Sequence, residues 1–335
     1  MDKWLKSIRE KQNKRALPVL TFPAIQLMGN TVDELVKNTD LQVRALKLIN
    51  ERCHPLAITG FMDLSIEAEA FGAQIQYSDD EVPNVVGSIV NSEEDARNLR
   101  IPSVGEKRTG LFIETIKKVK EDIHDCPVFA GCIGPFSLAG RLLDVTEAMI
   151  YCYDEPDMVH MVLDKVTTFL IEYIKAYKEV GADGIFIAEP LAGILSPALC
   201  DEFSSQYVKR IVDALDEENF IVIYHNCGNN TLKMTDTMLS TGCRVFHFGN
   251  AISIEEMIEK MPKDVFVMGN IDPVHLKDCT KEEVIEETKS LLDKIGDVEN
   301  FIISSGCDIP PMSKWENIDA FMQVSQDYYQ NENNS

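Results

Sequence analysis

Short apolar segments alternate along the chain with longer stretches in which apolar residues recur every three or four positions. The short segments are rich in β-branched and aromatic residues and are apolar throughout, which is typical of strands buried on both faces. They predict eight strands, at residues 18–22, 55–61, 128–134, 184–189, 220–224, 244–248, 265–269 and 301–305. Eight buried strands with helices between them most simply close into a (β/α)8 TIM barrel.

The longer stretches predict helices over residues 157–180, 196–215, 254–261 and 281–295. The second begins with Ser196-Pro197, an N-cap residue followed by a proline that suits the first helical position. We also expect an N-terminal helical extension, and the polar segment 71–110 predicts an insertion after the second strand. The alternative is a doubly wound open sheet, but no G-x-G-x-x-G follows a strand. We therefore expect a single α/β domain over residues 1–335, with its core at about 18–329.

Composition and charge exclude several classes of protein. The 335 residues are 45% apolar, which argues against disorder, and no run approaches the roughly 20 apolar residues of a membrane span. Lys and Arg number 32 against 55 Asp and Glu, a net charge of −23 that disfavours nucleic acid as a partner. The charged N-terminus lacks the apolar stretch of a secretory signal, and nine cysteines show no disulfide framework. Both features predict a cytoplasmic protein.

Polar residues follow many of the predicted strands, where a barrel carries its active site. Asp63 and Glu189 are candidate catalytic carboxylates, with helix capping as the alternative for each. Asn229, Asn270 and Asp272 are candidate ligand-binding residues, with turn formation as the alternative.

The most informative pattern is His225-x-Cys227 at the end of one strand and Cys307 at the end of another. Residues i and i+2 of an extended segment point the same way, so one imidazole and one thiolate can converge. Two cysteines and one histidine form a three-ligand zinc set that leaves a position open, as in catalytic sites. Packing residues are the alternative. His247 is a possible fourth ligand, and a buried histidine bonded to the backbone is its alternative.

Three stretches resemble the uroporphyrinogen decarboxylase superfamily, over nearly the whole chain. They are FMDLSIEAEAFG around Asp63, IAEPLAGILSP around Glu189, and the pair YHNCGN and SSGCDIPP around His225, Cys227 and Cys307. Within the superfamily the chain is most similar to the corrinoid-dependent branch that includes methylcobalamin:coenzyme M methyltransferases. The resemblance implies that His225, Cys227 and Cys307 hold Zn²⁺, which binds the thiol of a small methyl acceptor. It also implies a methyl-corrinoid on a carrier protein as the other substrate.

The resemblance leaves some alternatives open. It implies that a decarboxylase would carry arginines near the first strand, and the segment TFPAIQLMGN has none, which argues against decarboxylation. Asp63, however, matches the aspartate with which the decarboxylases hold pyrrole NH groups. Some methyltransferase relatives place an acidic zinc ligand after the sixth strand, where this chain has Gly249 and Asn250. The expected acceptor is a thiol such as coenzyme M, or else tetrahydrofolate. The rival hypotheses are a decarboxylase-like lyase acting on a tetrapyrrole and a non-catalytic corrinoid- or tetrapyrrole-binding protein.

Overall fold

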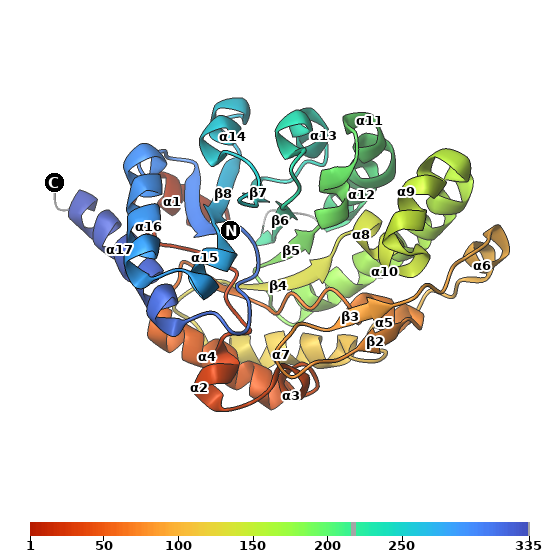
Figure 1. Ribbon diagram of the computed structural model, residues 1–335, viewed down its shortest axis with the longest axis horizontal. Helices are drawn as coiled ribbons and strands as arrows, with labels where there is room; N and C mark the ends of the chain where they lie inside the picture. The colour runs from red at the N-terminus through yellow and green to blue at the C-terminus, as the bar shows by residue number, and fades with distance from the viewer. Residues whose placement is uncertain (216–218, 334–335) are drawn as a thin grey trace.

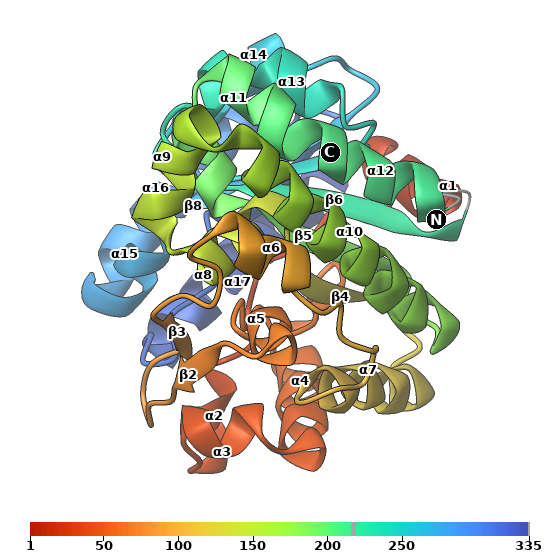
Figure 2. The same cartoon turned by 90° about the vertical axis from the view of Figure 1, so that its right-hand side faces the viewer.

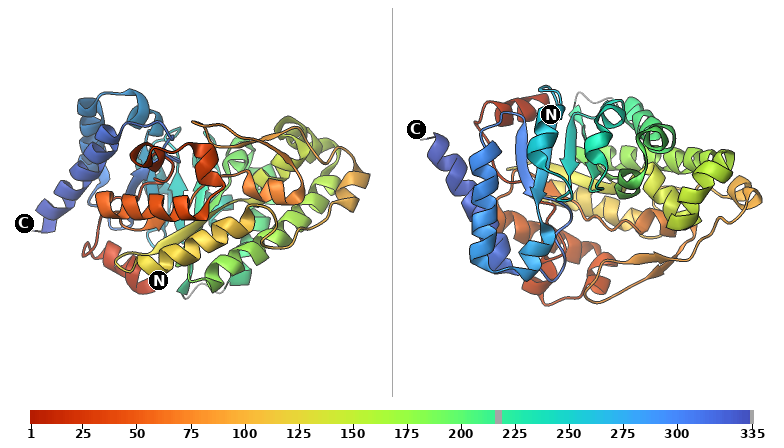
Figure 3. Two further views of the ribbon diagram at one scale, coloured as in Figure 1. Left: turned by 90° about the horizontal axis from the view of Figure 1, so that it is seen from below. Right: turned by 45° about the horizontal axis from the view of Figure 1, so that its top comes forward.

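Seven parallel strands form a curled sheet at the centre of the molecule, with helices around it (Figures 1 and 3). The computed structural model describes residues 1–215 and 219–333. In the sheet the order is β1 (Ile58–Thr59), β4 (Val128–Ile133), β5 (Gly184–Ala188), β6 (Ile221–Asn226), β7 (Val245–Phe248), β8 (Phe266–Ile271) and β9 (Phe301–Ser305). The predicted α/β barrel architecture is thus confirmed.

The gap between β9 and β1 is closed by an extended segment rather than by a strand. In this segment the amide of Leu17 donates to the carbonyl of Ile303, and the carbonyl of Ala16 accepts from the amide of Leu56, both at 2.9 Å. The strand predicted at 18–22 is wrong, because Pro18 has no N–H to donate and the chain turns into a helix at Pro23. The strand predicted at 55–61 shortens to β1, since only two of its residues pair regularly with β4.

The predicted helices form, with one change. Helices α10 (Pro156–Glu179), α14 (Ile254–Lys260) and α16 (Lys281–Ile295) match the periodic stretches. The stretch 196–215 divides into α11 (Pro197–Cys200), a π-helical turn η2 (Asp201–Ser205) and α12 (Gln206–Leu215), with the Ser196 hydroxyl accepting from the amide of Leu199.

The remaining helices surround the sheet or cover the ends of the barrel. They are α1 (Asp2–Arg9), α2 (Ala24–Met28), α3 (Val32–Val36), α4 (Thr39–Cys53), α5 (Ile66–Phe71), α6 (Glu93–Asn98), α7 (Thr109–Asp122), α8 (Pro135–Leu143), α9 (Val145–Asp154), α13 (Thr235–Leu239), α15 (Pro273–Asp278) and α17 (Trp315–Asn333), with short 3₁₀ turns η1 (Pro190–Ile194) and η4 (Thr231–Lys233). Within the described ranges, no helix combines the length and apolar composition needed to cross a membrane.

The two ends of the barrel are covered differently. The N-terminal extension forms α1, whose Leu5 and Ile8 join the apolar cluster inside the barrel. The insertion contains an antiparallel hairpin of β2 (Gln74–Gln76) and β3 (Asn84–Val86). Figure 2 shows α1 at one end of the barrel, with this hairpin and α15 at the other. The insertion thus covers the end of the barrel at which the strands have their carboxyl ends.

The barrel interior is built from alternate positions along the strands. Its apolar cluster includes Leu17, Val19, Phe129, Phe186, Ala188, Ile221, Ile223, Val245, Phe266, Met268 and Ile302. Because side chains alternate between the two faces of a strand, the next inward position after Ile223 is 225, and after Val245 it is 247. The apolar filling therefore gives way to histidines toward the carboxyl ends of β6 and β7.

Candidate metal centre

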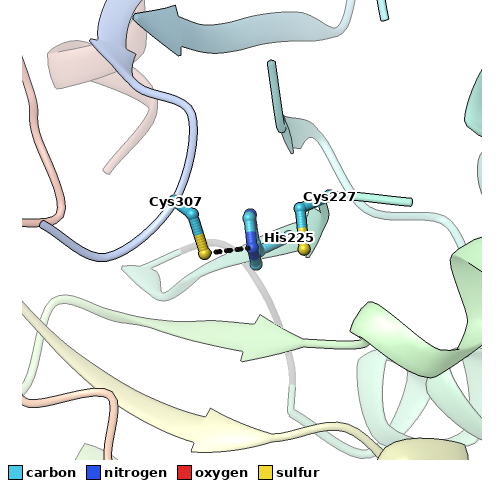
Figure 4. A group of neighbouring side chains, drawn as sticks. All are labelled: His225, Cys227 and Cys307. Carbon is cyan, nitrogen blue, oxygen red and sulfur yellow. Dashed lines mark hydrogen bonds between the residues drawn. The ribbon is translucent and has the colours of Figure 1, made fainter. Parts of the chain in front are cut away.

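The carboxyl ends of β6 and β9 bring together the three residues that the sequence predicts as metal ligands. His225 is the last but one residue of β6 and is 5% exposed, and Cys227 follows the strand directly. Cys307 lies two residues beyond the end of β9. One ligand atom from each of the three lies within 4.8 Å of the other two. In Figure 4 the imidazole of His225 lies between the two cysteine side chains.

The distances and atom types fit a zinc ion. The Sγ of Cys307 lies 3.6 Å from the Nε2 of His225. Zn–S and Zn–N bonds of about 2.3 and 2.0–2.1 Å, set at a tetrahedral angle, separate a sulfur and a nitrogen by roughly 3.6 Å. Two thiols and one imidazole form a donor set that binds zinc in preference to magnesium or calcium, which prefer oxygen donors. The residues present therefore fit a three-ligand zinc site.

The two thiols influence each other's ionisation. The pKa of Cys227 falls to about 4, because the Cys307 thiol hydrogen-bonds to it and His225 lies beside it. The pKa of Cys307 rises well above its usual range, because it shares that hydrogen bond with the Cys227 thiolate and is buried. One cysteine of the pair is thus held as the thiolate, the form that binds metals.

Gly249, just after β7, makes room for Cys227. A Cβ at position 249 would lie 2.6 Å from the Cβ and 2.7 Å from the Cα of Cys227, closer than such atoms approach in proteins. An acidic ligand at this position is therefore excluded while Cys227 keeps its place, and the neighbouring Asn250 is exposed. The departure from the acidic ligand of some relatives thus has a steric cause.

We expect Gly249→Ala to weaken zinc binding by about tenfold or more without unfolding the barrel, because the new methyl group displaces Cys227. Zinc affinity measured by competition with a chromophoric chelator, alongside thermal unfolding, checks this. Ala251→Gly is the control, because it changes a nearby residue of the same loop and leaves the contact between Gly249 and Cys227 intact. Gly242→Ala is unsuitable, because Gly242 has a positive φ that alanine adopts only with strain. Unchanged affinity in Gly249→Ala would contradict the steric account.

His247 lies beside the centre and is not one of the three converging residues. Its ring centroid is 4.6 Å from that of His225, and its Nε2 donates to the carbonyl of Ser305 at 2.6 Å. Complete burial and the neighbouring His225 lower its pKa well below the usual value, so the ring is neutral. These contacts match the alternative of a buried histidine bonded to the backbone, and they fix the ring against which His225 packs.

Asp63, predicted as a catalytic carboxylate, is buried and already paired. It accepts hydrogen bonds from the amide and hydroxyl of Ser65, at 3.0 and 2.6 Å, and from the Nη1 of Arg108. The Nε of Arg108 also donates to Glu69 at 2.7 Å, and Tyr77 donates to the same carboxylate at 3.0 Å. The structure therefore gives Asp63 a guanidinium partner from the insertion, which sequence analysis missed.

Glu67, in the same sequence stretch, is fully buried and only half satisfied. Its Oε1 accepts from the amide of Ile133 at 3.1 Å, while its Oε2 has no hydrogen-bond partner among the described residues. Burial raises the pKa of this carboxyl to about 8. Glu67 is therefore a neutral acid in the core near neutral pH.

The raised pKa of Glu67 predicts a pH dependence of stability. The folded protein holds a proton here that the unfolded chain releases near pH 4.5, so this contribution to stability is present below about pH 4.5 and is lost as pH rises to about 8. Glutamine imitates the neutral acid. In Glu67→Gln we therefore expect the free energy of unfolding to lose less between pH 5 and pH 9 than in the wild type, by on the order of a few kcal/mol. Urea unfolding of both proteins at pH 5 and pH 9 measures it. Parallel losses in the two proteins would contradict the assignment.

Glu189 is buried between β5 and η1, and its carboxylate caps a different helix. It accepts from the amides of Phe136 and Ser137, in the first turn of α8, at 3.3 and 2.9 Å, and from the hydroxyl of Ser204. Burial raises its pKa to about 7. Gly134 permits this contact, since a Cβ there would lie 2.1 Å from the Glu189 side chain. The carboxylate thus caps α8 and not the turn η1 that follows it in the chain.

The three predicted ligand-binding residues are not brought to the centre. Asn229 is exposed in the turn after β6. The amide of Asn270 donates to the carbonyls of Gly249 and Ile252, both at 3.0 Å. Asp272 is the N-cap of α15 and accepts from the amide of Val274 at 2.8 Å. Asn270 therefore holds the loop that carries Gly249, and Asp272 begins a helix.

The chain is similar to two groups of curated enzymes. It is 31% identical to the methylcobamide:CoM methyltransferase MtbA of Methanosarcina acetivorans over 79% of this chain and 78% of that protein. The MtbA of Methanosarcina mazei is 30% identical over the same shares. The uroporphyrinogen decarboxylase of Hydrogenovibrio crunogenus is 24% identical over 94% of this chain and 90% of its own. The higher identity to the methyltransferases identifies the chain as an enzyme of the methyltransferase kind.

The fold and the family agree with this similarity. A methyltransferase from Methanosarcina mazei has the same fold, with a TM-score of 0.86 and 22% identity over 97% of this chain and 98% of the other. The family uroporphyrinogen decarboxylase (URO-D) matches residues 15–328. The protein therefore belongs to the uroporphyrinogen decarboxylase (URO-D) family.

Proposed function

We propose that the protein is a zinc-dependent methyltransferase that moves a methyl group between a corrinoid on a carrier protein and a small thiol. The observation that carries the proposal is the convergence of His225, Cys227 and Cys307 at the carboxyl end of the barrel. The similarity to the two MtbA proteins, which are methylcobamide:CoM methyltransferases, supports the choice of a corrinoid and a thiol as substrates.

The chain's own residues hold and orient the site. His225, Cys227 and Cys307 would bind the metal and leave one position for the acceptor, and His247 packs against His225 to fix its ring. Zinc held there would lower the pKa of an acceptor thiol, so that it is a thiolate near neutral pH. In the transfer, a sulfur–carbon bond forms as the cobalt–carbon bond breaks, and the electron pair of that bond leaves with cobalt.

The distribution of exposed apolar side chains supports a protein as the carrier of the corrinoid. The large exposed apolar residues among those described lie in the connections that follow the carboxyl ends of the strands, or of the segment that closes the barrel. Each lies before the next long helix that runs back along the barrel. They are Leu27, Val86, Ile101, Ile150, Tyr153, Ile194, Val274 and Met312. Their shared position at the end of the barrel that carries the proposed metal centre is where a carrier protein would have to bind. All nine cysteines are free thiols, which supports our proposal of a cytoplasmic location.

A methyl-transfer assay tests the proposed function. Purified protein loaded with zinc is mixed with methylcobalamin and either a thiol or tetrahydrofolate, and loss of the methylcobalamin spectrum is followed. We expect demethylation that needs both zinc and a thiol. Tetrahydrofolate as the better acceptor would overturn the thiol assignment. Metal-independent conversion of uroporphyrinogen to coproporphyrinogen, or no turnover with any acceptor, would overturn the methyltransferase proposal.

A further inference from the structure

A pocket of about 430 Å³ lies next to the segment that carries Cys307. It is bounded by residues of the hairpin loop between β2 and β3, by Lys277 of α15, by Arg141 of α8 and by the segment after β9. Asp308, which directly follows Cys307, is part of its wall, and its Oδ1 has no hydrogen-bond partner among the described residues. The pocket is therefore a candidate binding site adjacent to the metal centre.

Arg141 is the unusual residue of this pocket. It is partly buried, and neither a hydrogen bond nor an ion pair from any described residue reaches its guanidinium. Burial lowers its pKa, and no carboxylate acts in the opposite direction, although Asp80 and Glu81 line the same pocket. A partly desolvated cation without a partner is costly. Arg108 shows the contrast, because its buried guanidinium is paired with two carboxylates.

The arrangement of charge suggests which ligand would satisfy Arg141. A guanidinium matches a carboxylate, sulfonate or phosphate with two parallel hydrogen bonds. Lys277, which is exposed in the same pocket and has no ion-pair partner among the described residues, adds a second cation. The lining also holds three carboxylates, Asp80, Glu81 and Asp308, so the observation that points to an anion is the unpaired guanidinium of Arg141 rather than the total charge of the pocket.

We propose that Arg141 binds the anionic group, a sulfonate or carboxylate, of the small methyl acceptor, with Lys277 as a second contact. This inference rests on the proposed function. A pocket of this volume takes a small molecule and is too small for a corrinoid macrocycle, so the anion is assigned to the acceptor. The phosphate of a corrinoid's nucleotide loop carries the same chemistry, and the experiment separates the two sources.

The first arm of the test measures anion binding without any chemistry. Ethanesulfonate and propionate are titrated by calorimetry into the full-length protein after zinc has been removed with a chelator. We expect Arg141→Gln to weaken binding of both anions by about 10- to 100-fold, and Arg141→Lys to weaken it less. Arg244→Gln is the matched control, because it removes the same charge from the amino end of β7, where Arg244 pairs with Asp2.

The second arm measures acceptor choice in the zinc-loaded protein. The value of kcat/KM for 2-mercaptoethanesulfonate is divided by that for the neutral 2-mercaptoethanol, with methylcobalamin as donor. We expect Arg141→Gln to lower this ratio about tenfold or more, mainly through KM for the anionic thiol, and Arg244→Gln to leave it unchanged. Methylcobinamide, which lacks the nucleotide phosphate, replaces methylcobalamin in a parallel series.

The outcomes separate this inference from the proposed function. Equal anion binding by the wild type and Arg141→Gln would overturn the role of Arg141. An effect of Arg141→Gln that appears with methylcobalamin and disappears with methylcobinamide would overturn the acceptor assignment in favour of the corrinoid phosphate. Anion binding that depends on Arg141 in a protein that transfers no methyl group to any thiol would support the anion site while overturning the methyltransferase proposal.

Discussion

Replacing either Cys227 or Cys307 with serine is expected to abolish stoichiometric zinc binding and to reduce methyl transfer from methylcobalamin by more than about 100-fold. Among the residues that the structure describes, three ligand residues converge, so loss of one thiolate would leave the metal with two of these protein ligands. A serine hydroxyl does not ionise near neutral pH and cannot replace a thiolate. The effect therefore follows from the number of ligands as well as from their chemistry.

Zinc per chain, measured by elemental analysis after dialysis, and the rate of methylcobalamin demethylation together measure this effect. Cys279→Ser is the matched control, because Cys279 is a partly exposed thiol that follows α15 and is outside the ligand group. Circular dichroism and thermal unfolding show whether each variant is folded. A folded Cys307→Ser protein that keeps one zinc and full activity would contradict the three-ligand site.

Replacing Arg108 with leucine is expected to lower the free energy of unfolding by about 3–5 kcal/mol. The substitution leaves Asp63, whose side chain is fully buried, without its guanidinium, and it also removes a partner from Glu69. Adding Asp63→Asn should recover part of this loss, because the second change removes the uncompensated buried charge. The comparison of single and double variants isolates the interaction between the two residues.

Urea unfolding at neutral pH measures this destabilisation. Arg100→Leu is the matched control, because Arg100 is also in the insertion but forms an exposed pair with Glu106, and such pairs contribute up to about 1 kcal/mol. If Arg108→Leu costs no more than Arg100→Leu, the buried pair between Arg108 and Asp63 contributes no more than an exposed pair, which would contradict this prediction.

Periodic and strand-end patterns predicted the parts of the molecule that depend on local sequence. The repeat of apolar residues located α10 and α16 within a residue of their observed ends. The His-x-Cys spacing predicted that the side chains of His225 and Cys227 lie on the same side of the chain at the end of β6. Barrel topology then placed Cys307 at the same end. The predicted strand at 18–22 failed because its apolar composition was right while Pro18 and the following turn prevented regular pairing.

Contacts between distant segments were not predictable in the same way. Arg108 reaches Asp63 across 45 positions, and nothing in the polar insertion distinguishes it from the exposed Arg100 before the chain is folded. Glu189 was expected to act in catalysis or to cap its own helix, whereas its carboxylate caps α8. Burial and partner geometry decide these roles, and both are tertiary properties.

X-ray absorption at the zinc edge tests the metal centre most directly. For the purified protein we predict one zinc per chain bound by two sulfurs at about 2.3 Å and by an imidazole nitrogen at about 2.0–2.1 Å, with a fourth light ligand. Cys227→Ser and Cys307→Ser should each lose a sulfur from the spectrum or lose the metal. A spectrum without sulfur, or one that neither substitution changes, would contradict the site on which the proposed function depends.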